Sequence, residues 1–308
     1  MRILVLGAAA GGGFPQWNAA DEANLRARRG DPAARPATQA SIALSADGEA
    51  WILVNASPDL RQQIAAHLDL WPRKAPRHSP IAAVVLTNGD VDAVAGLLHL
   101  REGTPFALYA APRTLAVLER NPIFEVLDRR LVPRRELPLE EPVTLRDAAG
   151  EPLGLELLAF PVPGKPPLYL EGEYGARLAT DAEEGDVIGV EFRARRRRVV
   201  YVGNVARLDD PLRARLAGAD VVFVDATLWR DDEMIQAGVG TKSGRRMGHV
   251  SVSGPGGVLE RLGDLPAGRK VLIHINNTNP ILLADSPERR EVEAAGFEVA
   301  YDGMEIVP

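Results

Sequence analysis

Residues 81–100 read IAAVVLTNGDVDAVAGLLHL. The short apolar run 81–86 is rich in β-branched residues and predicts a buried strand. A polar turn follows, and from Val91 apolar residues recur with helical spacing. Asp90 and Asp92 are therefore expected where a strand gives way to a helix, at the carboxyl end of the strand. Open α/β sheets place their ligand sites at this end.

Two carboxylates this close in sequence repel each other. A metal ion or a basic group between them would relieve the repulsion. A structural alternative for Asp90 is the N-cap of the following helix, where its side chain would bond backbone N–H groups. The stretch by itself leaves both interpretations open.

Composition excludes several classes of protein. The chain has 308 residues, of which 46% are hydrophobic and 25% charged, as in ordinary soluble globular proteins. Its formal charge of −6 argues against a nucleic-acid partner. It contains no cysteine, which excludes disulfides and thiolate chemistry and fits a reducing cytoplasm, where we expect the protein. No apolar run approaches the roughly 18 residues of a spanning helix, so no membrane segment is expected.

The rest of the chain alternates apolar strand patterns with helical ones and has neither a repeat nor an obvious linker. This pattern predicts one α/β domain over residues 1–308. A helix is expected from Ser57 as N-cap and Pro58 at its first position. Other expected helices start at Pro112 and cover 287–295. Strands are expected at 2–6, 39–45, 51–55, 107–110, 153–160, 187–192, 199–202, 220–225 and 271–275.

Several predicted strands end on polar residues. Besides the two aspartates, these are Asn204, Asp225 and His274. If the sheets converge at one edge, the carboxylates and the imidazole meet, and such a cluster suits Fe(II), Mn(II) or Zn(II). His249 would join this cluster or transfer protons beside it.

Two further segments offer ligand contacts. Trp17, in the glycine-rich loop region 11–18, would either stack on a flat ligand or cover the core. Lys165 lies within 161–167, which contains four prolines in seven residues and should therefore hold this lysine in a defined place.

The chain resembles the B-protein family of pyrroloquinoline quinone (PQQ) biosynthesis, a branch of the metallo-β-lactamase superfamily. The resemblance spans nearly the whole length. It is carried by GAAAGGGFPQWN (7–18), NASPDLRQQI (55–64), LTNGDVDAVAGLLHLREG (86–103), PVPGKPPLYLE (161–171), DATLWRDDEMIQAGVGTKSGRRMGH (225–249), HINNTNP (274–280) and DSPER (285–289).

This resemblance implies an αββα four-layer sandwich with the site at one edge of the sheets. It also implies a role in building the quinone from a cross-linked Glu–Tyr precursor. The family is described as an iron-dependent hydroxylase of the tyrosine ring, which implies Fe(II) as cofactor. An older proposal for the family is transport of the finished quinone.

Two departures from the family pattern matter. The superfamily metal motif H-x-H-x-D-H reads here Asn88, Asp90, Asp92 and Ala93 at its four ligand positions. The last histidine, which the family usually retains, is thus an alanine that cannot bind a metal. The expected site keeps Asp92 and His274, and Asp90, Asp225 or His249 would have to compensate. The family's C-x-C-x-x-C knuckle is replaced by AADEAN at 19–24, so no structural zinc is expected.

Three functions remain. The first is an iron oxygenase, with Asp92 and His274 on the metal, Asp90 assisting, and a set of residues that contact the precursor: Lys165, Lys242, Arg245, Arg246, Trp17 and Asn276. Arg245 and Arg246 would equally fit a solvent-facing loop. The second is a carrier for PQQ or a precursor, which Ala93 favours. A metal-dependent hydrolase is least supported, because most histidines of a dinuclear zinc site are missing. The oligomeric state stays open, with a homodimer as one option.

Overall fold

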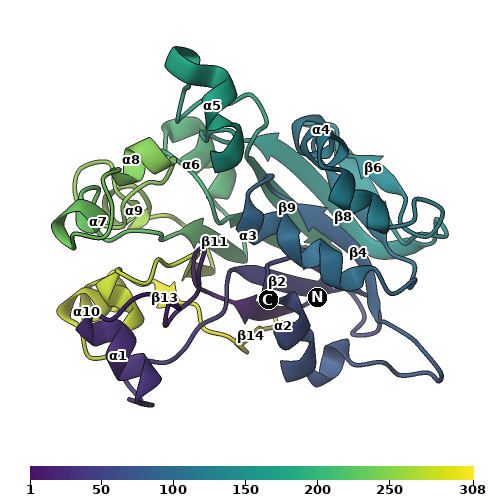
Figure 1. The fold of residues 1–308 in the computed structure, drawn as a ribbon, viewed down its shortest axis with the longest axis horizontal. Helices are drawn as coiled ribbons and strands as arrows, with labels where there is room; N and C mark the ends of the chain where they lie inside the picture. The colour runs from purple at the N-terminus through teal and green to yellow at the C-terminus, as the bar shows by residue number, and fades with distance from the viewer.

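The computed structural model describes residues 1–308 and contains two β-sheets packed face to face, with helices on the outer faces (Figure 1). Each sheet has seven strands. This arrangement confirms the αββα sandwich that the resemblance implies.

The first sheet has the order β14-β1-β2-β3-β4-β5-β6. Strands β1 to β3 pair antiparallel, whereas β3 to β6 run parallel. The strands are β1 (Arg2–Gly7), β2 (Ser41–Ser45), β3 (Trp51–Val54), β4 (Ile81–Leu86), β5 (Ala107–Ala110), β6 (Arg134–Glu136) and β14 (Glu305–Ile306).

The second sheet has the order β13-β12-β11-β10-β9-β8-β7. Its strands β7 to β10 are antiparallel neighbours, and β10 to β13 run parallel. The strands are β7 (Pro142–Arg146), β8 (Pro152–Pro161), β9 (Ile188–Ala194), β10 (Arg197–Val202), β11 (Val221–Asp225), β12 (Arg269–Ile273) and β13 (Glu298–Val299).

The helices are short. The α-helices are α1 (Glu22–Arg28), α2 (Leu60–Ala66), α3 (Val91–Val94), α4 (Pro112–Arg120), α5 (Glu171–Tyr174), α6 (Asp210–Leu216), α7 (Glu233–Gln236), α8 (Gly244–Met247), α9 (Val258–Leu262) and α10 (Pro287–Ala294). The 3₁₀ helices are η1 (Leu68–Leu70), η2 (Ala95–Leu100), η3 (Pro122–Val126), η4 (Leu168–Leu170), η5 (Gly175–Arg177) and η6 (Pro280–Leu282). None combines the length and the apolar character that a bilayer span requires.

Strand periodicity explains the layers. In β1, Ile3 and Val5 belong to a cluster of 60 buried residues that includes side chains of both sheets. Leu4 and Leu6 point to the opposite face and join a second cluster of 21 residues, together with side chains of α2, α3 and α4. Because successive side chains of a strand face opposite sides, one apolar strand serves two layers of the sandwich.

The structure confirms the strand at 81–86 and corrects the elements next to it. The segment after β4 contains one α-helical turn and continues as η2. Gly96 packs so closely against the loop before α2 that a Cβ would lie 2.0 Å from the carbonyl oxygen of Ser57. The predicted cap at Ser57 is also wrong. The Ser57 hydroxyl bonds Gln63 Oε1, and α2 starts after Asp59.

Candidate metal centre and ligand cavity

A cavity of about 330 Å³ lies where loops from both sheets meet. The segments after β4, β8, β10, β11 and β12 contribute polar groups to its wall. The lining residues are Ala10, Gly11, Asp90, Asp92, Lys165, Leu168, Glu171, Asn204, Thr227, Met234, Lys242, Met247, His249, His274 and Asn276. The structure thus brings together most of the candidates that the sequence placed at strand ends.

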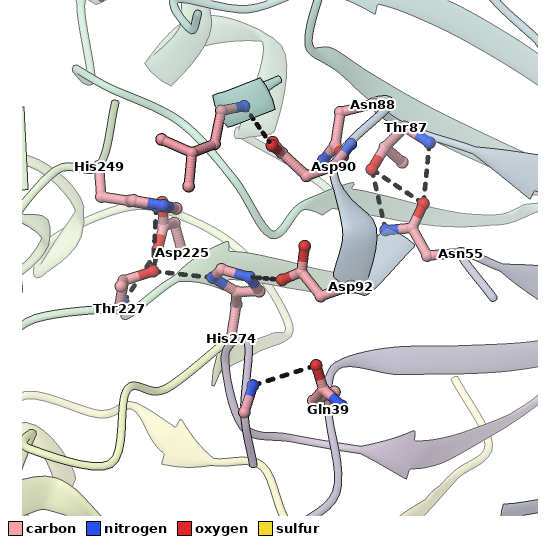
Figure 2. A network of polar contacts seen from close by, with 12 residues as sticks. Gln39, Asn55, Thr87, Asn88, Asp90, Asp92, Asp225, Thr227, His249 and His274 are labelled. Carbon is pink, nitrogen blue, oxygen red and sulfur yellow. Dashed lines mark hydrogen bonds and ion pairs between the residues drawn. The ribbon is translucent and has the colours of Figure 1, made fainter. Parts of the chain in front are cut away.

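His274 lies at the centre of this group (Figure 2). It follows β12 with a φ of 61°, a left-handed conformation that is uncommon for a residue with a side chain. Such strain is concentrated at functional sites. The ring lies between two partners: Nε2 is 2.9 Å from Asp92 Oδ2, and Nδ1 is 2.8 Å from Thr227 Oγ1.

A second imidazole is attached to the same network. His249 Nδ1 lies 2.7 Å from Asp225 Oδ2 and 3.0 Å from Thr227 Oγ1. The two histidine rings stack with centroids 5.2 Å apart. Asp225 is fully buried and also accepts hydrogen bonds from the backbone N–H groups of Val205 and Thr227. These bonds fix the carboxylate as the anchor of the network.

The hydroxyl proton of Thr227 determines what His274 can do. Thr227 Oγ1 donates to Asp225 Oδ1 at 2.7 Å, so it accepts from His274 Nδ1–H. His274 Nε2 then faces an oxygen of Asp92. Two lone pairs at 2.9 Å would repel, so Nε2 carries a proton or binds a cation that it shares with Asp92.

The negative charges around His274 favour both a protonated Nε2 and a cation bound there. Burial alone would lower the pKa of His274, but the hydrogen bond and charge of Asp92, with the charges of Asp225 and Asp90, outweigh it and raise the pKa above 6.5. Burial alone would raise the pKa of Asp92, yet its bond to His274 holds it below 3.8. The pKa of Asp225 is likewise lowered, because the charge and hydrogen bond of His249 outweigh burial.

The donor set fits a metal ion. Ligand atoms of Asp225, His249 and His274 all lie within 4.8 Å of one another. Atoms bound to one ion at about 2.0–2.2 Å lie roughly 3 Å apart, close to the separation of His274 Nε2 and Asp92 Oδ2. Metal-bound histidines usually donate their other N–H to a hydrogen-bond acceptor, as His274 does to Thr227.

Asp90 lines the cavity and does not cap α3 with its side chain, so the capping interpretation is wrong. It occupies the residue before α3, but its side chain makes no capping bond. Instead Oδ1 accepts from the backbone N–H of Leu168 at 3.2 Å. Burial and the nearby charge of Asp92 raise its pKa, and the charge of Lys165 acts in the opposite direction.

Three motif positions lack the superfamily's histidine, and two of them, Asn88 and Ala93, lie behind Asp92 and His274. Ala93 is buried and lines a space of about 10 Å³ behind Asp92 and His274, which is room for one water molecule. Asn88 lines the same space, and its Oδ1 accepts the backbone N–H of Asp90.

The cationic candidates gather on a residue that the sequence did not single out. Glu171 Oε1 is 3.1 Å from Lys165 Nζ, and Oε2 is 3.2 Å from Lys242 Nζ and 2.9 Å from Arg246 Nη2. Burial works against ionisation of Glu171, but hydrogen bonds from Arg246, Lys165 and Lys242 lower its pKa to about 2. Glu171 ends the family-like block 161–171, but two of its partners, Lys242 and Arg246, come from a distant segment, so the sequence did not identify it as their partner.

The structure places the remaining ligand-contact candidates in different surroundings. Asn276 lines the cavity, whereas Trp17 is 83% exposed and lies outside its lining. Arg245 lines a neighbouring cavity of about 720 Å³ instead. At the position of the missing cysteine knuckle, Asp21 caps α1 and Asn24 bonds Asn277, so amide and carboxylate contacts hold this segment.

Comparison with known proteins identifies the family. The Beta-lactamase superfamily domain matches residues 50–275. The Coenzyme PQQ synthesis protein B of Gluconacetobacter diazotrophicus is 56% identical over 304 residues, which cover 99% of this chain and 98% of that protein. That of Xanthomonas campestris (strain B100) is 52% identical over 306 residues, with 99% of both chains covered.

A solved structure agrees in fold along the whole chain. The crystal structure of Zn²⁺-bound PqqB from Methylobacterium extorquens has 49% sequence identity and a TM-score of 0.94, and the match covers 100% of both chains. A diphosphatase of the PhnP family, 21% identical with a TM-score of 0.68 and covering 99% of this chain and 97% of its own, shares the fold. This chain therefore belongs to the beta-lactamase superfamily and, within it, to the Coenzyme PQQ synthesis protein B family.

Proposed function

We propose that this chain acts in PQQ biosynthesis as a metal-dependent hydroxylase of the tyrosine ring in the cross-linked Glu–Tyr precursor. The observation that carries the proposal is the convergence of Asp92, His274 and His249 on one cavity whose wall also holds two lysines. The names of its relatives support the pathway, and the Zn²⁺-bound PqqB structure supports metal binding.

Asp92 and the Nε2 of His274 would hold the metal. Asp225, whose two oxygens already accept hydrogen bonds, would support the site through Thr227 and His249. An Fe(II) ion bound there would supply the one-electron chemistry with O₂ that ring hydroxylation needs. Thr227 and Asp225 orient the His274 ring through its Nδ1, which leaves Nε2 to the ion.

His249 is placed to move a proton. Its Nδ1 is held by Asp225, which favours the tautomer with the proton on Nδ1. Nε2 is then free to accept a proton from a phenol in the cavity that His249 lines.

Lys165 and Lys242 would bind carboxylates of the precursor, and Arg246 would add a guanidinium at the same place. An acidic protein would thus accept an acidic ligand through a local excess of positive charge. The homodimer stays a proposal, since no contact in the single chain bears on it.

One observation favours a second function, a carrier for PQQ or a precursor. The buried methyl group of Ala93 offers no ligand where the family usually has an imidazole. A metal would then have one protein donor fewer and bind more weakly.

Metal counting separates the two functions. The protein is loaded with Fe(II) under anaerobic conditions and, separately, with Zn²⁺, and bound metal is measured in the parent, Asp92→Ala, His274→Ala and Ala93→His. His99→Ala is the matched control, because His99 is exposed and lies outside the cavity.

If the chain is a hydroxylase, the parent should bind about one metal ion per chain. Asp92→Ala and His274→Ala should lose this ion, whereas His99→Ala should keep it. The metal-loaded parent should also consume O₂ when the precursor is added. A parent without metal that gains it in Ala93→His would reject the hydroxylase in favour of the carrier.

A further inference from the structure

A short segment above the cavity has no core of its own. We define the lid as residues 168–177, which form η4, α5 and η5. None of its residues is buried. Leu168 and Tyr169 are 60% and 45% exposed, and α5 projects at the top of the molecule in Figure 1. Apolar packing therefore contributes little to holding the lid in place.

Polar contacts attach the lid to the rest of the molecule. Its first residue donates to Asp90 Oδ1, and Tyr169 Oη donates to the carbonyl oxygen of Gly89 at 2.6 Å. Glu173 pairs with Arg120 in an exposed ion pair of the kind that contributes little stability. The least exposed lid contact is that of Glu171, whose side chain is only 11% exposed.

Glu171 is outnumbered by its partners. Three cationic groups, on Lys165, Lys242 and Arg246, face one carboxylate. Arg246 Nη1 is buried and has no hydrogen-bond partner. A buried, unsatisfied donor of a charged group is costly unless an acceptor can reach it. Glu171 Oε1 is also buried without a hydrogen-bond partner, so the present pairing leaves both Glu171 and Arg246 incompletely satisfied. The excess of positive charge therefore has capacity for another anion with better geometry.

We propose that Glu171 is a placeholder: it occupies a carboxylate subsite built by Lys165, Lys242 and Arg246, and a carboxylate of the ligand displaces it and the lid with it. The assignment of a polycarboxylate as ligand rests on the proposed function. The exchange itself rests only on the contacts of Glu171.

Exchange of one carboxylate for another explains why such a subsite would be occupied before the ligand arrives. Three unpaired cations in a half-closed cavity would repel one another, and Glu171 relieves this repulsion. An incoming carboxylate restores the same charge pairing, so the lysines and Arg246 lose nothing when Glu171 leaves. A neutral ligand cannot replace Glu171 without leaving the cations unpaired. The subsite thus selects for negative charge.

The test measures binding of PQQ, a soluble tricarboxylate, to the metal-loaded chain by titration calorimetry. Glu171→Gln keeps the shape of the side chain and removes the competing charge. Glu173→Gln is the matched control, since it removes a lid carboxylate that pairs outside the cavity. Hydrogen exchange of 168–177 in the parent, with and without PQQ, reports the lid directly.

We expect Glu171→Gln to bind PQQ about tenfold more tightly than the parent, the order of one charge-assisted hydrogen bond, and Glu173→Gln to bind like the parent. Lid exchange in the parent should become faster with PQQ, although ligands normally protect the segments they cover. Unchanged or weaker binding by Glu171→Gln, with slower lid exchange, overturns the proposal. Neither readout requires O₂ chemistry, so a failed hydroxylase test leaves this result independent.

Discussion

Replacing Asp225 with asparagine would test whether the buried carboxylate anchors the metal centre. Its Oδ2 accepts from Val205 N at 2.9 Å and from His249 Nδ1 at 2.7 Å. Its Oδ1 accepts from Thr227 N at 2.9 Å and from Thr227 Oγ1 at 2.7 Å. Both oxygens are thus acceptors, and Asp225→Asn must turn an NH₂ group toward one pair of donors.

The least harmful orientation places the NH₂ toward His249, because this imidazole can change its tautomer and accept. The N–H of Val205 still loses its acceptor, and the bonds of Thr227 lose their charge assistance. A hydrogen bond to a charged group contributes about 1.5–3 kcal/mol, so we expect a loss of about 3–5 kcal/mol, as for other broken buried pairs. With an unfolding entropy of about 2.1 cal mol⁻¹ K⁻¹ per residue over 308 residues, the Tm falls by about 5–8 °C.

The assay is urea unfolding followed by circular dichroism, with a chelator present so that metal release does not contribute. Asp210→Asn is the control: its side chain is 89% exposed and pairs with Arg261, so its effect should stay within about 0.5 kcal/mol. A loss below about 1 kcal/mol in Asp225→Asn would contradict the anchoring role, since even one orphaned buried donor costs that much.

Three further predictions concern pH, packing and the ligand. His274, whose pKa is raised above 6.5, stabilises metal-free protein fully below that pH and less as pH rises through its folded-state pKa. Urea unfolding from about pH 6 upward should show this decline, and Asp92→Asn should flatten it. In Gly96→Ala the new Cβ would lie 2.0 and 2.7 Å from two carbonyl oxygens, so we expect a loss of about 3 kcal/mol, against about 0.5 kcal/mol or less for Gly172→Ala, which has open space. Trp17→Ala should leave the PQQ affinity measured by calorimetry unchanged, because Trp17 is 83% exposed and lies outside the cavity. Weaker PQQ binding by this variant would show that Trp17 contacts the ligand after all.

Much of the fold follows from local pattern. The strand at 81–86 is confirmed residue by residue, and the helix beginning at Pro112 starts where predicted. These elements have clear apolar runs and breakers. The segment after β4 also has helical spacing, yet most of it is 3₁₀ helix. Its geometry depends on the contact of Gly96 with a loop some 40 residues earlier, which no local pattern reports.

The same distinction applies to the site: some of its residues follow from local pattern and topology, and others depend on tertiary contacts. Side chains at strand ends are predictable as a group, because the topology carries them to one edge, and Asp92 and His274 are in contact. Thr227 and Glu171 could not be recognised. Thr227 matters only because it lies within hydrogen-bond distance of two imidazoles, and Glu171 only because three cations surround it. Such roles are properties of a tertiary contact, and neither residue type is unusual at its position in the sequence.

The position of Asp90 links the lid to the metal centre. Its Oδ1 accepts the N–H of Leu168, the first residue of the lid, so one oxygen of the carboxylate that the motif would place on the metal is bonded to the lid. If a ligand carboxylate displaces Glu171 and the lid moves, this bond breaks and Asp90 becomes available beside Asp92. Coupling between two ligands is reciprocal: if PQQ strengthens metal binding by displacing the lid, the metal strengthens PQQ binding by the same factor. A metal that recruits Asp90 should therefore favour the displaced lid, and PQQ should raise the metal affinity of the parent more than that of Asp90→Asn.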